Sequence, residues 1–259
     1  MSTIAFEDVR ARYDGRPVLD RVTLAFAPGK VTGIVGPNGA GKTSLLRAAL
    51  GHLPLASGSV RIFNQPLAQW SREALARAIA YLPQAGDAHW PVTARHLVSL
   101  GRIPHRGRFR PFTGSDEAAI DNALSRADAT GFAARRLDEL SAGERARVMV
   151  ARALATEASI LLADEPAAYL DPSHQLRLME LFGEEAARGK AVVVTLHDLA
   201  LASRHCDEIV VLQRGRIAAQ GASETALSDA VLRQVFSIGA VRASGPSGPP
   251  ALVAWNRVS

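Results

Sequence analysis

The strongest constraint on the fold is a glycine-rich segment that follows a short apolar run. Residues 36–43 read Gly-Pro-Asn-Gly-Ala-Gly-Lys-Thr and match the pattern GxxxxGK[ST]. The run before it, residues 31–35, predicts a strand, and residues 42–52 predict a helix. Glycines let consecutive backbone N–H groups turn toward a phosphate at a helix N-terminus. The pattern therefore predicts a phosphate-binding loop. The alternative is a glycine-rich turn with an incidental lysine.

The chemistry of such a loop assigns a role to each polar side chain. Lys42 is one of only three lysines, and we expect it to reach the β- and γ-phosphates of a nucleotide. The Thr43 hydroxyl is expected to bind Mg²⁺. The predicted nucleotide-binding residues of this segment are Gly36, Pro37, Asn38, Gly39, Ala40, Gly41, Lys42, Thr43 and Ser44.

A second acidic element follows an apolar run, in the order Ile160-Leu-Leu-Ala-Asp164-Glu165-Pro166. The four apolar residues predict a buried parallel strand. Ligands of open α/β sheets bind at the carboxyl ends of strands, so we expect both carboxylates beside the phosphate loop. Asp164 is expected to hold the Mg²⁺ shell, and Glu165 to polarise the attacking water. The alternative is a pair of solvated acids at a strand end.

Strands and helices alternate along much of the chain, which predicts a mostly parallel sheet covered by helices. Residues 3–9 and 18–26 predict an antiparallel β subdomain at the N-terminus. We expect one domain, with a β/α core formed by residues 1–87 and 141–240. Residues 88–140 form an inserted helical subdomain, and residues 241–259 form a C-terminal hairpin or tail.

Composition narrows the function classes. The chain has 259 residues, 47% of them hydrophobic and 21% charged, which is ordinary for a globular protein. The net charge of +5 does not by itself indicate nucleic-acid binding. A single cysteine, Cys206, builds neither a disulfide nor a cysteine metal site, and we expect an inert buried thiol. His89, His96 and His105 lack metal-ligand spacing. No secretory signal and no membrane span is expected.

Five further segments occur in a characteristic order along the chain. One of them, Leu140-Ser-Ala-Gly-Glu144, precedes an amphipathic helical pattern. The other four are Tyr13 before the phosphate loop, Gln84 after a short predicted strand, Leu170-Asp171 after the acidic pair, and His197 after the predicted strand 191–196. Taken with the glycine-rich element and the acidic element, this set resembles the ATPases of ABC transporters over residues 3–220, with residues 140–144 in the place of the signature segment of that family. The resemblance implies a P-loop NTPase core that binds ATP and Mg²⁺.

The resemblance also implies roles for these residues. Tyr13 stacks on adenine, and Gln84 contributes to catalysis and to the Mg²⁺ site, which it shares with Thr43 and Asp164. Glu165, His197 and Lys42 act in catalysis. The resemblance further implies that ATP is contacted by residues of the signature and by the aspartate that follows the acidic pair: Ser141, Ala142, Gly143, Glu144 and Asp171.

Each of these residues also has an ordinary structural interpretation. Ser141 and Glu144 form the pattern of a helix capping box. Tyr13 could be a turn tyrosine and Gln84 a surface amide. His197 could be a core or capping histidine at the end of a buried strand.

The chain departs from the pattern of the family at four positions without losing a catalytic side chain. Ala142 replaces the first signature glycine, which removes backbone freedom where a phosphate is approached. Glu144 and Ala146 stand where Gln is frequent, and Ala167 where Thr is frequent. These changes put detailed rates in doubt.

A segment between Gln84 and the signature resembles one group of ATPases within this family. Residues 98–105, Val-Ser-Leu-Gly-Arg-Ile-Pro-His, resemble ATPases that energise uptake of iron siderophores, haem and cobalamin, and residues 231–236 do so too. Within that group, hemin import ATPases look nearest, with ferric siderophores and cobalamin as alternatives. Nearby arginines form either a solvated basic loop or a contact with acidic permease loops or lipid headgroups: Arg102, Arg106, Arg108 and Arg110.

The resemblance implies a mechanism and partners. Two copies would face each other head to tail, with ATP on the phosphate loop of one copy capped by the signature of the other. Closure would act on an integral membrane permease, and through it on a periplasmic binding protein. The protein would lie peripherally on the cytoplasmic face of the inner membrane and bind no nucleic acid. The rival interpretations are a soluble ABC ATPase acting on nucleic acid or ribosomes, and a nucleotide-binding regulator without hydrolysis.

Overall fold

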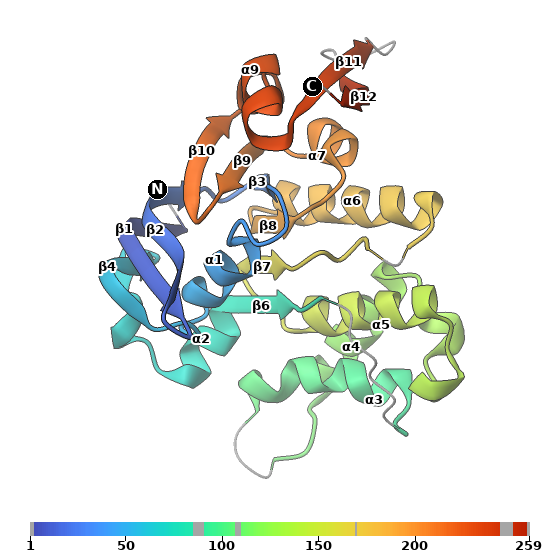
Figure 1. Cartoon of the computed structure of the whole chain (residues 1–259). Helices are drawn as coiled ribbons and strands as arrows, with labels where there is room; N and C mark the ends of the chain where they lie inside the picture. The colour runs from blue at the N-terminus through green and yellow to red at the C-terminus, as the bar shows by residue number, and fades with distance from the viewer. Residues whose placement is uncertain (1–2, 85–90, 107–109, 169, 244–250, 258–259) are drawn as a thin grey trace. The chain divides into compact units, whose positions relative to one another are not determined.

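The computed structural model describes residues 3–84, 91–106, 110–168, 170–243 and 251–257. The chain divides into two compact units (Figure 1). Unit 1 comprises Met1–Trp70 and Glu185–Ser259, and unit 2 comprises Ser71–Glu184. His89 and Arg108 lie outside the described residues.

Unit 1 contains an antiparallel sheet with the strand order β2-β1-β4-β5, which confirms the predicted N-terminal β subdomain. Its strands are β1 (Ile4–Tyr13), β2 (Arg16–Phe26), β4 (Leu55–Ile62) and β5 (Gln65–Pro66). Apolar and polar residues alternate along much of β2, so one face is buried and the other faces water. Phe6 and Phe26 meet edge to face in this core, with ring centroids 6.1 Å apart.

A second set of strands in unit 1 positions the phosphate loop. In the order β10-β9-β3-β8 these strands are β10 (Arg216–Gly221), β9 (Glu208–Gln213), β3 (Lys30–Val35) and β8 (Ala191–Thr195). β3 runs parallel to both β8 and β9, whereas β10 is antiparallel to β9. All five residues of β8 are buried, as expected for a parallel strand that is covered on both faces.

The other elements of unit 1 surround these sheets. They are α1 (Lys42–Ala49), η1 (Leu67–Gln69), α7 (Leu199–His205), α8 (Ser223–Ala226), α9 (Asp229–Val231), η5 (Leu232–Phe236), β11 (Ile238–Ala243) and β12 (Ala251–Arg257). β11 and β12 pair as an antiparallel hairpin. Its Leu252 is buried, and the backbone N–H of this residue donates to the hydroxyl of Ser203 in α7.

The single cysteine lies under β3. A Cβ atom at Gly33 would lie 2.7 Å from the Cys206 sulfur, so glycine permits this close packing. Burial raises the pKa of the Cys206 thiol to about 12. The thiolate is therefore scarce at neutral pH, which confirms the prediction of an inert buried thiol.

Unit 2 combines one parallel strand pair with several helices. Its elements are α2 (Arg72–Ala78), β6 (Ile79–Leu82), α3 (Ala94–Ser99), η2 (Leu100–His105), α4 (Gly114–Arg126), η3 (Thr130–Phe132), η4 (Leu137–Glu139), α5 (Ala142–Ala155) and β7 (Ile160–Ala163). β6 and β7 are parallel. Both α3 and α4 pack on α5 (Figure 1).

One helix continues from the second unit into the first. Helix α6 (Pro172–Ala187) begins in unit 2 and ends in unit 1.

Across the described part of the chain, no helix has the length and apolar character needed to cross a bilayer.

Candidate functional site

The phosphate loop of unit 1 wraps around its lysine. Lys42 opens helix α1 and is only 5% exposed. Its ammonium Nζ donates a hydrogen bond to the Gly36 carbonyl at 3.0 Å, which joins the last part of the loop to its first residue. The loop therefore holds a cation at its centre, as a site for phosphate oxygens requires.

Two glycines of this loop adopt backbone conformations that other residues avoid. Gly36 and Gly41 have φ angles of +157° and +106°. A Cβ atom at Gly36 would lie 2.3 Å from the Leu212 carbonyl oxygen, and one at Gly41 would lie 2.7 Å from the Val18 carbonyl oxygen. Both the φ angles and the close backbone contacts exclude a side chain. The glycine spacing of the motif thus has a direct structural cause.

The N-terminus of α1 is suited to an anion. Gly41 occupies the N-cap and supplies no side-chain cap, and the first turn contains no acidic residue. The positive end of the helix dipole therefore faces the loop without a neutralising carboxylate. Thr43 and Ser44, which follow Lys42, are both partly exposed. The residues present fit a nucleotide phosphate.

Tyr13 and His197 are the other predicted site residues of unit 1. Tyr13 ends strand β1 and is 56% exposed, which leaves its ring face accessible. His197 follows β8 and is exposed, so it is not a core histidine. Asp198 caps α7 by accepting from the backbone N–H groups of Ala200 and Leu201. The interpretation of His197 as a core residue is therefore wrong.

The acidic pair of unit 2 lies at the end of β7, where the sequence predicts it. Asp164 is 2% exposed, and its backbone N–H donates to the Leu82 carbonyl of β6 at 2.8 Å. The Tyr81 hydroxyl lies 3.4 Å from the Asp164 carboxylate. Asp164 is thus a buried carboxylate, and the interpretation as a solvated acid is wrong for this residue.

Gln84 and Glu165 meet through their side chains. The amide Nε2 of Gln84 donates to Glu165 Oε2 at 2.8 Å. The backbone of Glu165 has a φ angle of +48°, in the left-handed region that non-glycine residues seldom occupy. Such backbone strain concentrates at functional sites, where it aims a side chain. Asp128 and Glu157 of the same unit have similar φ angles, +51° and +52°, so the hydrogen bond to Gln84 is what distinguishes Glu165.

The signature segment begins helix α5 with a complete capping box. The Ser141 hydroxyl accepts from the Glu144 backbone N–H at 3.3 Å, and the Glu144 carboxylate accepts from the Ser141 backbone N–H at 2.8 Å. The Ser141 backbone N–H is the main cause that lowers the pKa of Glu144. The structural interpretation of this pair is confirmed. It leaves a role toward ATP open, because Ser141 and Ala142 are exposed.

Asp171 caps the start of helix α6, and its partner there is His174, which the sequence analysis did not single out. The backbone N–H of His174 donates to Asp171 Oδ1 at 3.0 Å, and His174 Nδ1 lies 2.7 Å from Asp171 Oδ2. These contacts lower the pKa of Asp171, with the backbone N–H as the main cause. The Gln175 amide also binds the Ala167 carbonyl at 3.0 Å. The only signal in the sequence was the spacing Asp-x-x-His at a helix start.

The prediction that Arg102 belongs to an exposed basic loop is wrong. Its side chain is buried, with 6% of the residue exposed, and it binds Asp116 and Glu157. Burial and two carboxylate partners exclude both a solvated loop and a direct contact with a permease or lipid. The Arg106 guanidinium instead lies over the Phe112 ring, 4.1 Å from its centroid.

A phosphate loop at a helix N-terminus, together with an acidic pair after a buried strand, defines a nucleoside triphosphatase of the P-loop class. Residues 19–168 match the family model described as ABC transporter. The chain belongs to the ABC transporter family, and its activity is ATP hydrolysis.

Relatives and solved structures agree with this assignment. The chain is 44% identical to the hemin import ATP-binding protein HmuV of Streptomyces coelicolor, over 88% of this chain and 81% of the relative. It is 42% identical to the cobalamin import ATP-binding protein BtuD of Halobacterium salinarum, over 86% of this chain and 56% of the relative. A dimeric ATP-binding cassette in a post-hydrolysis state, bound to ADP and Pi, superimposes with a TM-score of 0.75. That structure is 26% identical, and the match covers 85% of this chain and 98% of the other.

Proposed function

We propose that this protein is the ATP-hydrolysing subunit of an importer that carries hemin through a membrane permease. The similarity to a hemin import ATP-binding protein over four fifths of that protein's length is the observation that carries the choice of hemin. The cobalamin import protein matches over a smaller share of its own length, which makes cobalamin the second candidate. A ferric siderophore remains a third candidate from the segment Val98–His105.

The chemistry at the reacting phosphate is divided among few side chains. Lys42 stabilises the negative charge that builds up on the γ-phosphate, and His197 contacts the same group. Glu165 orients or activates the attacking water, and its bond to Gln84 holds the carboxylate in place. Tyr13 offers an exposed ring to the adenine. Backbone N–H groups of residues 36–44 bind the phosphates.

A magnesium ion would be held by the Thr43 hydroxyl, the Gln84 amide oxygen and the Asp164 carboxylate. These are oxygen donors, which Mg²⁺ prefers. Gln84 uses its nitrogen toward Glu165, so its oxygen is the atom that suits a metal. When bound, the ion neutralises charge on the β- and γ-phosphate oxygens.

The composite site requires a second copy of the chain. ATP on the loop of one copy is capped by Ser141, Ala142, Gly143 and Glu144 of the other copy, with Asp171 at the same contact. The exposure of Ser141 and Ala142 at a helix N-terminus supports this proposal. Closure of the pair acts on an integral membrane permease, and a periplasmic binding protein takes part indirectly. The protein then works peripherally, on the cytoplasmic face of the inner membrane, without nucleic acid.

The test of the transported ligand uses the cell that makes the protein. Deleting the gene should abolish growth on hemin as the sole iron source and leave growth on ferrous iron intact. A plasmid copy should restore growth, and a Glu165→Gln copy should not. Uptake of labelled hemin, a ferric siderophore and cobalamin is measured in parallel. Normal hemin uptake, with loss of one of the other two, would assign the importer to that ligand.

Ser141→Arg tests whether the signature acts across the dimer. We expect each copy to bind ATP normally while hydrolysis falls about a hundredfold, because the bulky side chain prevents the signature from closing over the ATP that the partner holds. The matched control is Ser71→Arg, since Ser71 caps α2 by accepting from the Ala74 backbone N–H at 3.1 Å. Both variants lose a helix cap worth about 1 kcal/mol.

ATP turnover and ATP affinity are measured for both variants. Near-normal turnover by Ser141→Arg, with a loss of stability equal to that of the control, would reduce the Ser141–Glu144 pair to a helix cap.

A further inference from the structure

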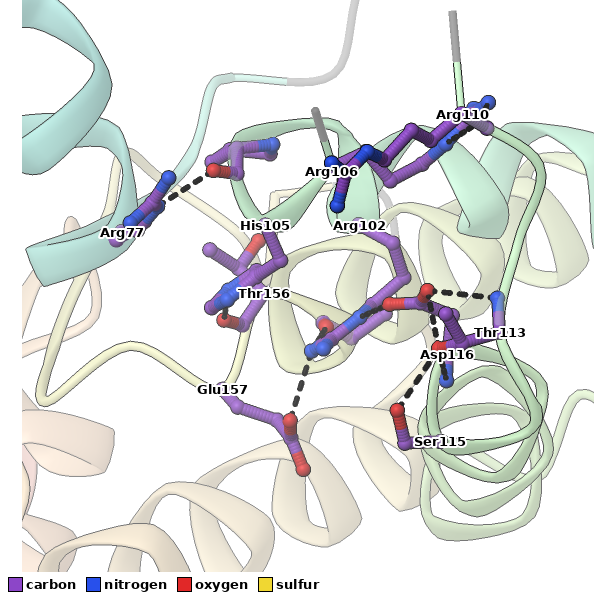
Figure 2. A network of polar contacts seen from close by, with 12 residues as sticks. Arg77, Arg102, His105, Arg106, Arg110, Thr113, Ser115, Asp116, Thr156 and Glu157 are labelled. Carbon is purple, nitrogen blue, oxygen red and sulfur yellow. Dashed lines mark hydrogen bonds and ion pairs between the residues drawn. The ribbon is translucent and has the colours of Figure 1, made fainter. Parts of the chain in front are cut away.

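Segment η2 lies against the C-terminal end of helix α5, the helix that the signature begins. A Cβ atom at Gly101 would lie 2.3 Å from the Arg152 carbonyl oxygen of α5. Glycine at this position therefore permits the two backbones to approach. The residues that follow in η2 then direct polar side chains at the last carbonyls of the helix (Figure 2).

Two side chains of η2 bind backbone carbonyls where α5 ends. Arg102 Nη1 donates to the Ala155 carbonyl at 2.9 Å, and His105 Nε2 lies 2.7 Å from the Thr156 carbonyl oxygen. The last carbonyls of a helix have no intrahelical partner and carry the negative end of its dipole. A buried guanidinium is a strong partner for them. The C-terminal end of α5 is thus bound by side chains from a segment 50 residues earlier in the chain.

Two carboxylates also bind the Arg102 guanidinium. Its Nε donates to Asp116 Oδ1 at 2.9 Å, and its Nη1 donates to Glu157 Oε2 at 2.7 Å. Asp116 accepts from the backbone N–H and the hydroxyl of Thr113, at 3.0 Å and 2.7 Å, at the start of α4. The Thr113 backbone N–H is the main cause that lowers the pKa of Asp116 to about 2. Asp116 is therefore ionised at neutral pH and keeps Arg102 in one orientation.

The contacts of Arg102 and His105 at the C-terminal end of α5 also bear on its N-terminal end, where the signature lies. α5 has 14 residues and starts directly after Ser141. A helix of this length is a stiff element about 21 Å long, so an anchor at its C-terminal end limits the motion of its N-terminal end. We propose that Arg102, assisted by His105, is a positioning residue for the composite ATP site. It holds the C-terminal end of α5 and so sets where residues 141–144 point. This inference rests on the proposed function.

The test compares variants in a Glu165→Gln background, in which ATP should trap the closed dimer. Arg102→Lys keeps a positive charge toward Asp116 but loses the two contacts that Nη1 makes with Ala155 and Glu157. His105→Ala removes only the contact with Thr156 and, being at an exposed position, should preserve the fold. The matched control is Arg106→Ala, whose guanidinium binds the Arg110 carbonyl and the Phe112 ring instead.

We expect Arg102→Lys to weaken ATP-dependent dimerisation by about tenfold, the effect of losing a hydrogen bond to a charged group. The effect of His105→Ala should be smaller and in the same direction. ATP affinity of the single copy should stay unchanged in all variants, because the phosphate loop belongs to unit 1. Arg106→Ala should match its parent. Dimerisation is measured by sedimentation, and amide hydrogen exchange is measured at residues 141–144.

Faster exchange at residues 141–144 in the Arg102 and His105 variants would support the role directly. Unchanged exchange and unchanged dimerisation, at a temperature where the variants are folded, would overturn it, even if their melting temperatures fall. Failure of the Glu165→Gln parent to form a dimer would instead contradict the proposed function. In that case the exchange measurement still decides whether Arg102 positions the signature.

Discussion

Glu165→Gln is expected to lower ATP turnover at least about a hundredfold while ATP binding stays normal. The amide keeps the shape of the side chain and can still meet Gln84, which binds Glu165 Oε2 at 2.8 Å. It cannot accept a proton from the attacking water. With ATP and Mg²⁺ present, the variant should accumulate as a closed dimer, because binding continues and hydrolysis does not.

Turnover is measured by phosphate release, and the dimer by size-exclusion chromatography. The matched control is Glu180→Gln, at an acidic residue of the same unit whose exposed side chain contacts only Arg177 among the ion pairs described. The control should hydrolyse ATP at a rate close to that of the unchanged protein. A Glu165→Gln variant that stays monomeric and turns over ATP normally would contradict the role of Glu165.

Lys42→Ala is expected to weaken ATP binding about a hundredfold or more, since the cation at the centre of the phosphate loop is removed. The Lys42 ammonium binds the Gly36 carbonyl within the loop, and the loop is otherwise shaped by glycine backbone. The fold should therefore survive the change. ATP binding is measured at equilibrium, and thermal unfolding is followed for the same samples.

A second lysine supplies the control for this experiment. Lys30 lies on β3 in the same unit, and its ammonium binds Glu208 Oε1 at 2.7 Å. Lys30→Ala should leave ATP affinity unchanged, because this lysine is committed to a strand contact. If Lys42→Ala retained near-normal ATP affinity, the assignment of residues 36–44 as the nucleotide loop would fail.

The features that the sequence predicts well depend on neighbours along the chain. The phosphate loop is specified by glycines whose φ angles and close contacts exclude side chains, and by a lysine one residue after Gly41. The Ser141–Glu144 capping box needs only a spacing of three residues at a helix start. Buried strands such as β7 and β8 are recognisable as unbroken apolar runs.

The features that the sequence analysis missed depend on residues far apart in the chain. Arg102 belongs to a basic stretch by its neighbours, yet Asp116, Glu157 and the Ala155 carbonyl bury it. No local pattern distinguishes it from Arg106, which remains near the surface.

The sequence by itself therefore determined the class of protein and predicted a set of nucleotide-binding residues, because loop geometry and helix capping are local properties of the backbone. Only the tertiary structure decided how those residues are supported. It joined Gln84 to Glu165, strained the backbone of Glu165 and turned Arg102 inward to the end of α5. The contacts of Arg102 arise when the chain packs, since a buried charge must find a partner wherever the fold provides one.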